Sequence, residues 1–170
     1  LRNKTIYMRL IILSIFLLFS WIIRSQTEEK TTIYLIRHCE KETGSVDPEL
    51  SEIGKLRAEN WKNYFDEIPI DSFYTTATKR TATTCSIIAD SKKKEIQFYN
   101  HNDFSLNEII KIHQGKTLLI VGHSNTLPNL INTFLEEEFY SLISENEYGS
   151  LFTITIQGET IKHELTYSNN

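Results

Sequence analysis

Two histidines in this chain each follow a short apolar run that is rich in β-branched residues. His38 comes directly after residues 32–37, and His123 comes directly after residues 117–122. Such runs indicate buried strands of a parallel sheet, and ligands of open α/β sheets bind just beyond the carboxyl ends of the strands. An imidazole is nucleophilic near neutral pH, and the guanidinium of Arg37 offers a planar fork of donors suited to phosphate oxygens. The two histidines therefore predict a site for an anionic ligand at this edge.

A second arginine is placed to join this site. Residues 74–81 indicate a strand that turns into a helix, with Arg80 in the first helical turn. Backbone N–H groups at the start of a helix attract anions, and Arg80 adds a full positive charge. Ahead of the second histidine, Gly122 permits close approach of the backbone, and behind it Ser124 or Asn125 can cap the following helix. Two histidines and two arginines thus converge on one edge of the predicted sheet.

The elements that must position these residues alternate between strand and helix. This alternation predicts an α/β fold, a three-layer α/β/α sandwich whose mostly parallel sheet ends in an antiparallel edge. The expected strands are residues 32–37, 70–75, 96–99, 117–121, 148–157 and 160–167, and the expected helices are residues 52–65, 78–89, 106–113 and 126–135. Ser51 is the expected N-cap of the first of these helices, and Gly158 the turn between the last two strands.

The first 25 residues differ in composition from the rest of the chain. Three basic residues precede an apolar stretch, residues 10–23, that only two serines interrupt. This order is typical of a secretory signal peptide, and the stretch is shorter than the roughly 20 residues that a spanning helix prefers. The boundary at Ser25 fits the small-x-small cleavage pattern poorly, so an uncleaved membrane anchor formed by residues 10–23 stays an alternative. We expect an exported protein, periplasmic or extracellular, with a signal peptide or anchor at 1–25, a linker at 26–31 and one domain at 32–170.

The remaining composition is that of a globular domain, with 40% hydrophobic and 24% charged residues in a chain of 170. Four of the 18 basic residues and none of the 22 acidic residues precede Gln26, which leaves the remainder with a net charge of −8. The chain has no basic stripe of the kind that a nucleic-acid-binding protein needs. Cys39 and Cys85 are its two cysteines. Export permits a disulfide, but their positions in separate elements leave a bridge between them open.

With these motifs in order, the chain resembles the histidine phosphatase superfamily, the phosphoglycerate-mutase-like fold, from about residue 31 to at least residue 135. Residues 37–40 (RHCE) resemble the Arg-His-x-Glu signature, without a glycine after the histidine. Residues 47–58 resemble the segment that opens the first helix of the family, and residues 74–84 the Ser-x-x-x-Arg-Thr-x-x-Thr element. Residues 121–128 resemble the motif of the second histidine. Four ordered motifs are far more specific than any one of them.

The resemblance implies a phosphomonoesterase that needs no cofactor or metal. His38 would attack phosphorus in line and form a phosphohistidine, which water then hydrolyses. Arg37, Arg80 and His123 would hold the non-bridging oxygens, with Ser124 as a further candidate ligand. A backbone carbonyl would hold the other ring nitrogen of His38.

The proton donor for the leaving group is less clearly marked. Members of the family often take an acid from the region after the third strand, where Asp103 is the one carboxylate and His101 a substitute. Glu40 would support the nucleophile. Some small members have no such acid and act on phosphoramidates, whose leaving nitrogen needs less help.

Three alternatives stay open from the sequence. The chain could bind a phosphorylated ligand with little turnover, or it could be a phosphohistidine or phosphoprotein phosphatase. A metallohydrolase is disfavoured because the histidines lack the spacing of metal ligands. The short segment between the third strand and His123 leaves the site without a long capping insertion, which fits a phosphatase acting on a small phosphorylated substrate better than a mutase. Contact with a membrane is expected only through the N-terminal segment.

Overall fold

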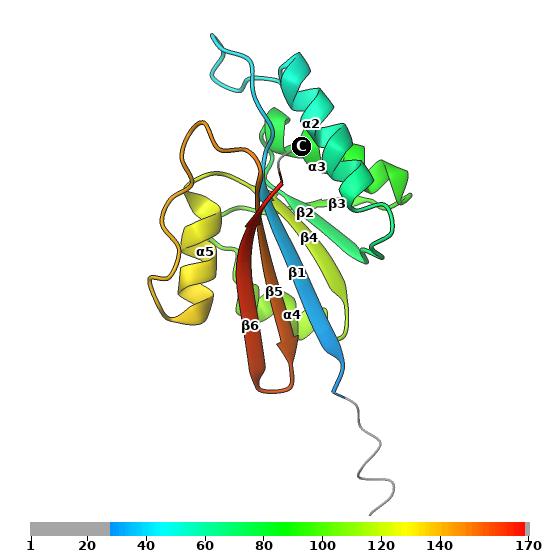
Figure 1. The fold of residues 1–170 in the computed structure, drawn as a ribbon, viewed down its shortest axis with the longest axis vertical. Helices are drawn as coiled ribbons and strands as arrows, with labels where there is room; N and C mark the ends of the chain where they lie inside the picture. Colours follow the sequence, from blue (N-terminus) through cyan, green and yellow to red (C-terminus); the bar gives the residue numbers. More distant parts are fainter. Residues whose placement is uncertain (1–27, 169–170) are drawn as a thin grey trace, which may run out of the picture.

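A computed structural model describes residues 28–168 of the chain, and within them six strands form one sheet in the order β3-β2-β4-β1-β5-β6. The strands are β1 (Lys30–Arg37), β2 (Ser72–Thr75), β3 (Ile96–Phe98), β4 (Thr117–Gly122), β5 (Ser150–Gln157) and β6 (Thr160–Tyr167). The helices are α2 (Glu52–Tyr64), α3 (Lys79–Ser91), α4 (Leu106–Ile112) and α5 (Thr126–Leu135). Figure 1 shows α2 and α3 on one side of the sheet and α5 on the other. The predicted α/β sandwich is confirmed.

The pairing of the strands also agrees with the prediction. Strands β3, β2, β4 and β1 pair in parallel, whereas β5 is antiparallel to β1 and β6 is antiparallel to β5. In the register between β1 and β4, Arg37 is the partner of Gly122. The residues that follow these two strands, His38 and His123, therefore emerge side by side at one edge of the sheet.

Apolar side chains fill the space on both faces of the sheet. The two buried clusters hold α2 and α3 against one face and α4 and α5 against the other. Successive residues of β4 alternate between these clusters, because side chains of a strand point to opposite faces. The largest fully buried apolar side chains include Phe65 and Phe73 on the first face and Phe152 and Leu118 on the second. This continuous burial fixes the ends of the central strands, which carry the predicted site.

Two predicted helix caps have different outcomes. The hydroxyl of Ser51 accepts a hydrogen bond from the Gly54 N–H at 3.1 Å, as expected for the N-cap of α2. At α5 the expectation was wrong, because neither Ser124 nor Asn125 makes a side-chain cap. Asn125 has helical dihedral angles in place of the extended ones that a capping side chain requires, and the Ser124 hydroxyl donates to Glu145 instead.

Cys39 and Cys85 are free and buried, so they form no disulfide in this structure. Burial raises the pKa of each thiol to about 12. The predicted signal peptide or anchor lies outside the described residues. Among residues 28–168, no helix is both long enough and apolar enough to span a membrane.

Candidate active site

The carboxyl ends of β1 and β4 form one wall of a cavity of about 890 Å³. His38, Arg37, Arg80 and His123 all line it, so the structure brings together the four residues that the sequence analysis placed at this edge. The two imidazole rings lie 5.5 Å apart between centroids and meet edge to face. A Cβ at Gly122 would come within 2.9 Å of the Tyr99 hydroxyl and closer still to a leucine side chain, so the close packing here requires glycine.

His38 has a defined pattern of hydrogen bonds at both ring nitrogens. Its Nδ1 lies 2.7 Å from the carbonyl oxygen of Cys39, and because a carbonyl can only accept, Nδ1 carries the proton. The other nitrogen, Nε2, accepts from Arg80 Nε at 3.2 Å and therefore presents a lone pair to the cavity. Burial lowers the pKa of His38 to about 3, and the positive charges of Arg37 and Arg80 also favour the neutral ring. His38 is thus a neutral imidazole at neutral pH, protonated on Nδ1 and not on Nε2.

Cys39, the residue whose carbonyl orients His38, is itself held by helix α3. The Cys39 N–H donates to the Thr84 hydroxyl at 3.1 Å, and that hydroxyl donates to the carbonyl of Arg80 at 2.8 Å. Thr84 is fully buried. Helix α3 thus fixes the backbone of Cys39 through its N–H, and the carbonyl of the same residue orients the imidazole, which gives the second threonine of the Arg-Thr-x-x-Thr element a positioning role.

Arg37 is 1% exposed and divides its donors between the protein and the cavity. Its Nη1 donates to the carbonyls of Ser144, Glu145 and Glu147 at 2.8, 3.0 and 2.9 Å. Its Nη2 donates to the Glu145 carboxylate at 3.1 Å, and the Tyr148 ring covers the guanidinium at 4.2 Å from its centroid. The Nε atom is buried and has no hydrogen-bond partner within residues 28–168. The Nε and Nη2 side is therefore the one that can receive a phosphate.

Arg80 lies in the first turn of α3, as predicted. Its Nη1 is 3.5 Å from the carboxylate of Asp47, which also accepts from the backbone N–H of Lys79 at 3.1 Å. Asp47, in the loop after β1, thus offsets the positive charge of both Arg80 and the start of α3. Since the Asp47 side chain is exposed and the Arg80 side chain mostly buried, the arginine is the fixed partner of this pair.

His123 is oriented by a cluster of threonine hydroxyls. Its Nε2 lies 2.9 Å from the Thr76 hydroxyl, which lies 2.8 Å from the hydroxyl of Thr81. The Thr81 hydroxyl also lies 2.9 Å from the carbonyl of Thr76, directly after the end of β2, and can donate to it. Burial lowers the pKa of His123 to about 4, and the nearby charges of Arg80, His101 and Arg37 act in the same direction.

Glu40 lies behind the cavity and is not one of its lining residues. Its carboxylate accepts from Arg57 Nε at 2.8 Å and pairs with Arg57 Nη2 at the same distance. Its backbone carbonyl accepts from Ser51 N–H at 3.0 Å, and a Cβ at Gly54 would collide with that carbonyl. Glu40 therefore ties helix α2 to the end of β1, next to the nucleophile.

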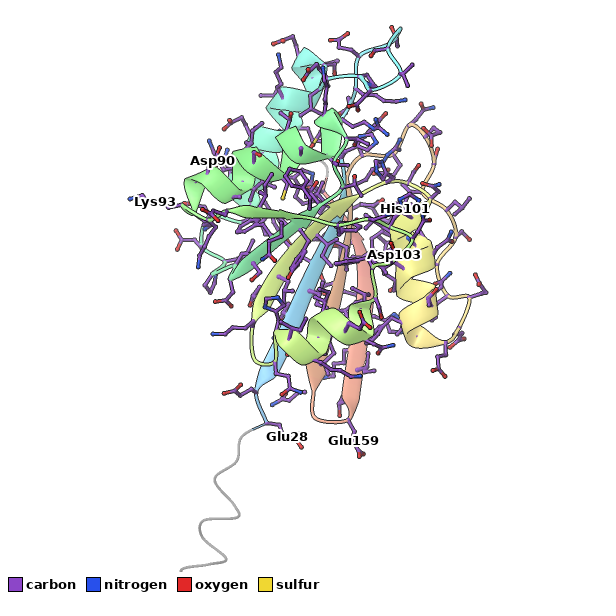
Figure 2. The ribbon with its side chains drawn as sticks, turned by 180° about the vertical axis from the view of Figure 1, so that it is seen from behind. Glu28, Asp90, Lys93, His101, Asp103 and Glu159 are labelled. Atoms are coloured by element: carbon purple, nitrogen blue, oxygen red, sulfur yellow. The ribbon has the colours of Figure 1, made fainter. Side chains whose placement is uncertain are left out.

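The predicted proton donor Asp103 is not brought together with the histidines. It is exposed in a turn between β3 and α4 and is absent from the cavity lining, whereas His101 of the same turn lines the cavity. In Figure 2, His101 lies nearer than Asp103 to the end of the sheet where β1 and β4 finish. The turn is closed by bonds from the Asn102 and Asp103 N–H groups to Asn100, which leaves its tip in solvent.

Two carboxylates that the sequence analysis did not assign to the site do line the cavity, Asp47 and Glu145. Asp47 falls inside the motif at residues 47–58 and could have been suspected. Glu145 lies in residues 136–149, where no motif points to it, and it reaches Arg37 from 108 positions away in the chain. A local pattern carries no signal for such a contact. Within residues 28–168, no three histidine, cysteine, aspartate or glutamate side chains cluster in a way that could hold a metal ion.

Comparison with known proteins adds to this geometry. Residues 33–104 match the family model of the histidine phosphatase superfamily, branch 1. The structure is similar to YhfR of Bacillus stearothermophilus (19% identity, TM-score 0.64, covering 78% of this chain and 94% of that one). It is also similar to a phosphoserine phosphatase of Entamoeba histolytica (16% identity, TM-score 0.64, covering 82% of this chain and 97% of that one). A third similar structure is a candidate phosphohistidine phosphatase, SixA, of Nakamurella multipartitia (13% identity, TM-score 0.61, covering 85% of this chain and 100% of that one). At these identities the likeness is one of fold. No curated protein sequence matches the chain significantly.

Proposed function

We propose that the chain is a member of the histidine phosphatase superfamily, whose model matches residues 33–104, and a phosphohydrolase that acts on phosphomonoesters through a phosphohistidine at His38. One observation carries the proposal. The Cys39 carbonyl holds the proton of His38 on Nδ1, so that Nε2 is unprotonated and its lone pair, which accepts from Arg80 Nε at 3.2 Å, can turn to phosphorus when Arg80 moves to the phosphate oxygens. A neutral imidazole so oriented, between two guanidinium groups, is suited to attack a phosphorus atom.

The reaction would proceed in two displacements. Nε2 of His38 forms a bond to phosphorus while the bond from phosphorus to the leaving oxygen breaks, and that oxygen takes up a proton. Water then attacks the phosphohistidine, which releases inorganic phosphate and restores the imidazole. Arg37 Nε and Nη2, Arg80 and His123 would bind the non-bridging oxygens and stabilise the charge that develops on them.

A second cavity of about 300 Å³ adjoins the first and supports a small substrate. The two cavities share His101 and Thr126, so a leaving group in the second could extend from a phosphoryl group in the first. Apart from His101, the lining residues are uncharged: Asn102, Phe104, Ser105, Leu106, Asn107, Asn129, Leu130, Thr133 and Phe134. We propose that the leaving group is uncharged and carries hydroxyl or amide groups.

The function is tested by replacing the nucleophile in the full chain. We expect His38→Ala to lower turnover of 4-nitrophenyl phosphate by about 10³-fold or more, since a covalent route is lost. His163→Ala is the matched control, because this histidine lies on β6, outside the cavity lining, where it is hydrogen-bonded to Tyr140. Circular dichroism of both variants should be unchanged. Turnover by His38→Ala at the rate of the unmodified protein would refute the proposal.

One observation favours a second candidate, a phosphohistidine or phosphoprotein phosphatase. Asp103 is outside the cavity, and both lining carboxylates are paired with arginines. A site with no ready acid is better matched to a phosphoramidate than to an alkyl ester. A higher kcat/KM for phosphoramidate than for glycerol 2-phosphate would favour this candidate, and the reverse order would favour the monoesterase. Binding of both compounds without turnover would identify a phospho-ligand-binding protein.

We also propose that residues 1–25 direct export of the protein, either as a cleaved signal peptide or as an anchor. The basic start and apolar core of this segment support the proposal. Expression of the full chain in a bacterial host, followed by fractionation and intact mass measurement, distinguishes a shortened periplasmic protein from a membrane-bound full-length one. Full-length protein in the cytosol would contradict export.

A further inference from the structure

The carboxylate of Glu145 lies on Arg37 Nη2, which the proposed reaction assigns to phosphate, and on the hydroxyl of Ser124, a further candidate ligand from the sequence. One oxygen accepts from Arg37 Nη2 at 3.1 Å, and the other accepts from the Ser124 hydroxyl at 2.8 Å. Glu145 lines the same cavity as His38 and His123. The Ser124 hydroxyl has a single proton, so it can donate to the carboxylate or to a phosphate oxygen, but not to both. Two anions sharing one guanidinium would also repel each other.

Glu145 lies against the nitrogen of Arg37 that a phosphate bound by two hydrogen bonds would share with Nε. Nη1 is committed to three backbone carbonyls, at Ser144, Glu145 and Glu147. Nε is the one nitrogen of this side chain that lacks a partner in the described part of the chain, and of the two Nη2 protons one goes to the Glu145 carboxylate. A phosphate that binds Arg37 through two hydrogen bonds must therefore use Nη2 beside Nε, where the Glu145 carboxylate lies.

The side chain of Glu145 can leave without disturbing the fold. It is 75% exposed, whereas the Arg37 side chain is 1% exposed. The backbone around it stays anchored, because Arg37 Nη1 holds three carbonyls of the loop and the Ile143 N–H donates to the Ser124 carbonyl at 3.0 Å. The Ser124 hydroxyl and the Arg37 charge lower the pKa of Glu145, so the group competes as an anion at neutral pH. An ion pair this exposed adds little to stability, which leaves it easy to exchange.

We propose that Glu145 is a built-in competitor of phosphate, a residue that weakens the affinity of the site for the phosphoryl group and for the product. The inference rests on the proposed function for the identity of the phosphate-binding donors. Removal of the carboxylate should tighten the binding of phosphate, whereas an ordinary ligand-binding residue would weaken it when removed.

The experiment measures binding and turnover separately, in the full chain. Titration calorimetry with inorganic phosphate at pH 7 is compared for the unmodified protein, Glu145→Ala, Glu145→Gln and Glu137→Gln. Glu137 is an exposed acid of the same loop that does not line the cavity, so its variant removes an equal charge as a control. We expect Glu145→Ala to bind phosphate about 10-fold more tightly, Glu145→Gln to lie between, and Glu137→Gln to match the unmodified protein. The KM for 4-nitrophenyl phosphate should fall in the same order.

Each outcome either supports or overturns the role of Glu145 as a competitor of phosphate. Unchanged or weaker phosphate binding in Glu145→Ala overturns the proposal, as does an equal gain in Glu137→Gln, which would show a general charge effect. A loss of kcat on alkyl but not aryl phosphates in Glu145→Gln would identify a proton donor instead. Because calorimetry needs no turnover, tighter binding in a protein without phosphatase activity would uphold this inference while the proposed function fails. Hydrolysis that depends on His38 together with unaltered binding would do the opposite.

Discussion

The two halves of the cavity are built on different principles. The strand-end half, made of Arg37, His38, Arg80 and His123, stands on β1, β4 and the start of α3, and each side chain has a partner that fixes it. The loop half, made of His101 and Glu145, stands on two surface connections and is exposed. Sites on rigid elements hold their geometry, whereas loops vary and move. The first half is therefore suited to the phosphoryl group that all substrates share, and the second to selection among leaving groups.

The largest expected effect lies in the strand-end half. Arg80→Ala should lower kcat/KM for 4-nitrophenyl phosphate by about 10²–10³-fold, because a charged donor to the transition state is lost. Lys79→Ala is the neighbouring control, since Lys79 pairs with Glu49 at the surface. Equal losses of kcat/KM from the two substitutions would contradict a role of Arg80 in binding phosphate that its surface neighbour Lys79 lacks.

A smaller effect is expected in the loop half, and only for some substrates. His101→Ala should lower kcat/KM for glycerol 2-phosphate by up to about 10²-fold but hardly change that for 4-nitrophenyl phosphate, whose leaving group needs no proton. Asp103→Asn should change either value by less than roughly twofold, because Asp103 is exposed and outside the cavity. If Asp103→Asn produced the selective loss and His101→Ala did not, the turn would have to rearrange when substrate binds.

A third comparison concerns a residue that never meets the substrate. Thr84→Val leaves the Cys39 N–H without an acceptor, and this loosens the residue whose carbonyl orients His38. We expect kcat to fall about 10-fold and KM to change little. Thr84→Ser keeps the hydroxyl and should restore most of the activity. Equal loss in both variants would point to packing of the methyl group rather than to the hydrogen bond.

The smallest effect is a dependence of stability on pH. The pKa values of His38 and His123 in the folded protein, about 3 and about 4, lie below the usual value of 6.5 for an unfolded chain. Between these limits the unfolded chain binds more protons, so the free energy of unfolding falls as the pH drops from about 6.5 towards 3. Urea midpoints at pH 7 and pH 4.5 measure this fall, and His123→Asn should reduce it. A midpoint that rises towards low pH would contradict the burial of neutral histidines.

The same division explains what the sequence could predict. His38 and His123 follow apolar runs whose local pattern indicates strands, so their meeting at one edge follows from parallel pairing. Asp103 could not be placed, because its exposure depends on a turn that Asn100 closes and on the stacking of Phe104 against Tyr99. No motif in the sequence around Glu145 indicates that it lies at the site. Residues set by elements were predictable, and residues set by distant packing were not.

The grip of Arg37 on three carbonyls of the loop before β5 has a consequence for the order of folding. These bonds join positions 107 to 110 residues apart, so they close one of the longest loops in the protein. Contacts of such long sequence separation require the entropy of loop closure to be overcome first, so we expect them to form late. A chain still emerging from the ribosome, or one cut off after α5, would carry every motif residue of the phosphate site and yet lack the scaffold that aims Arg37. Acquisition of phosphate affinity should then coincide with the docking of β5 and report a late step of folding.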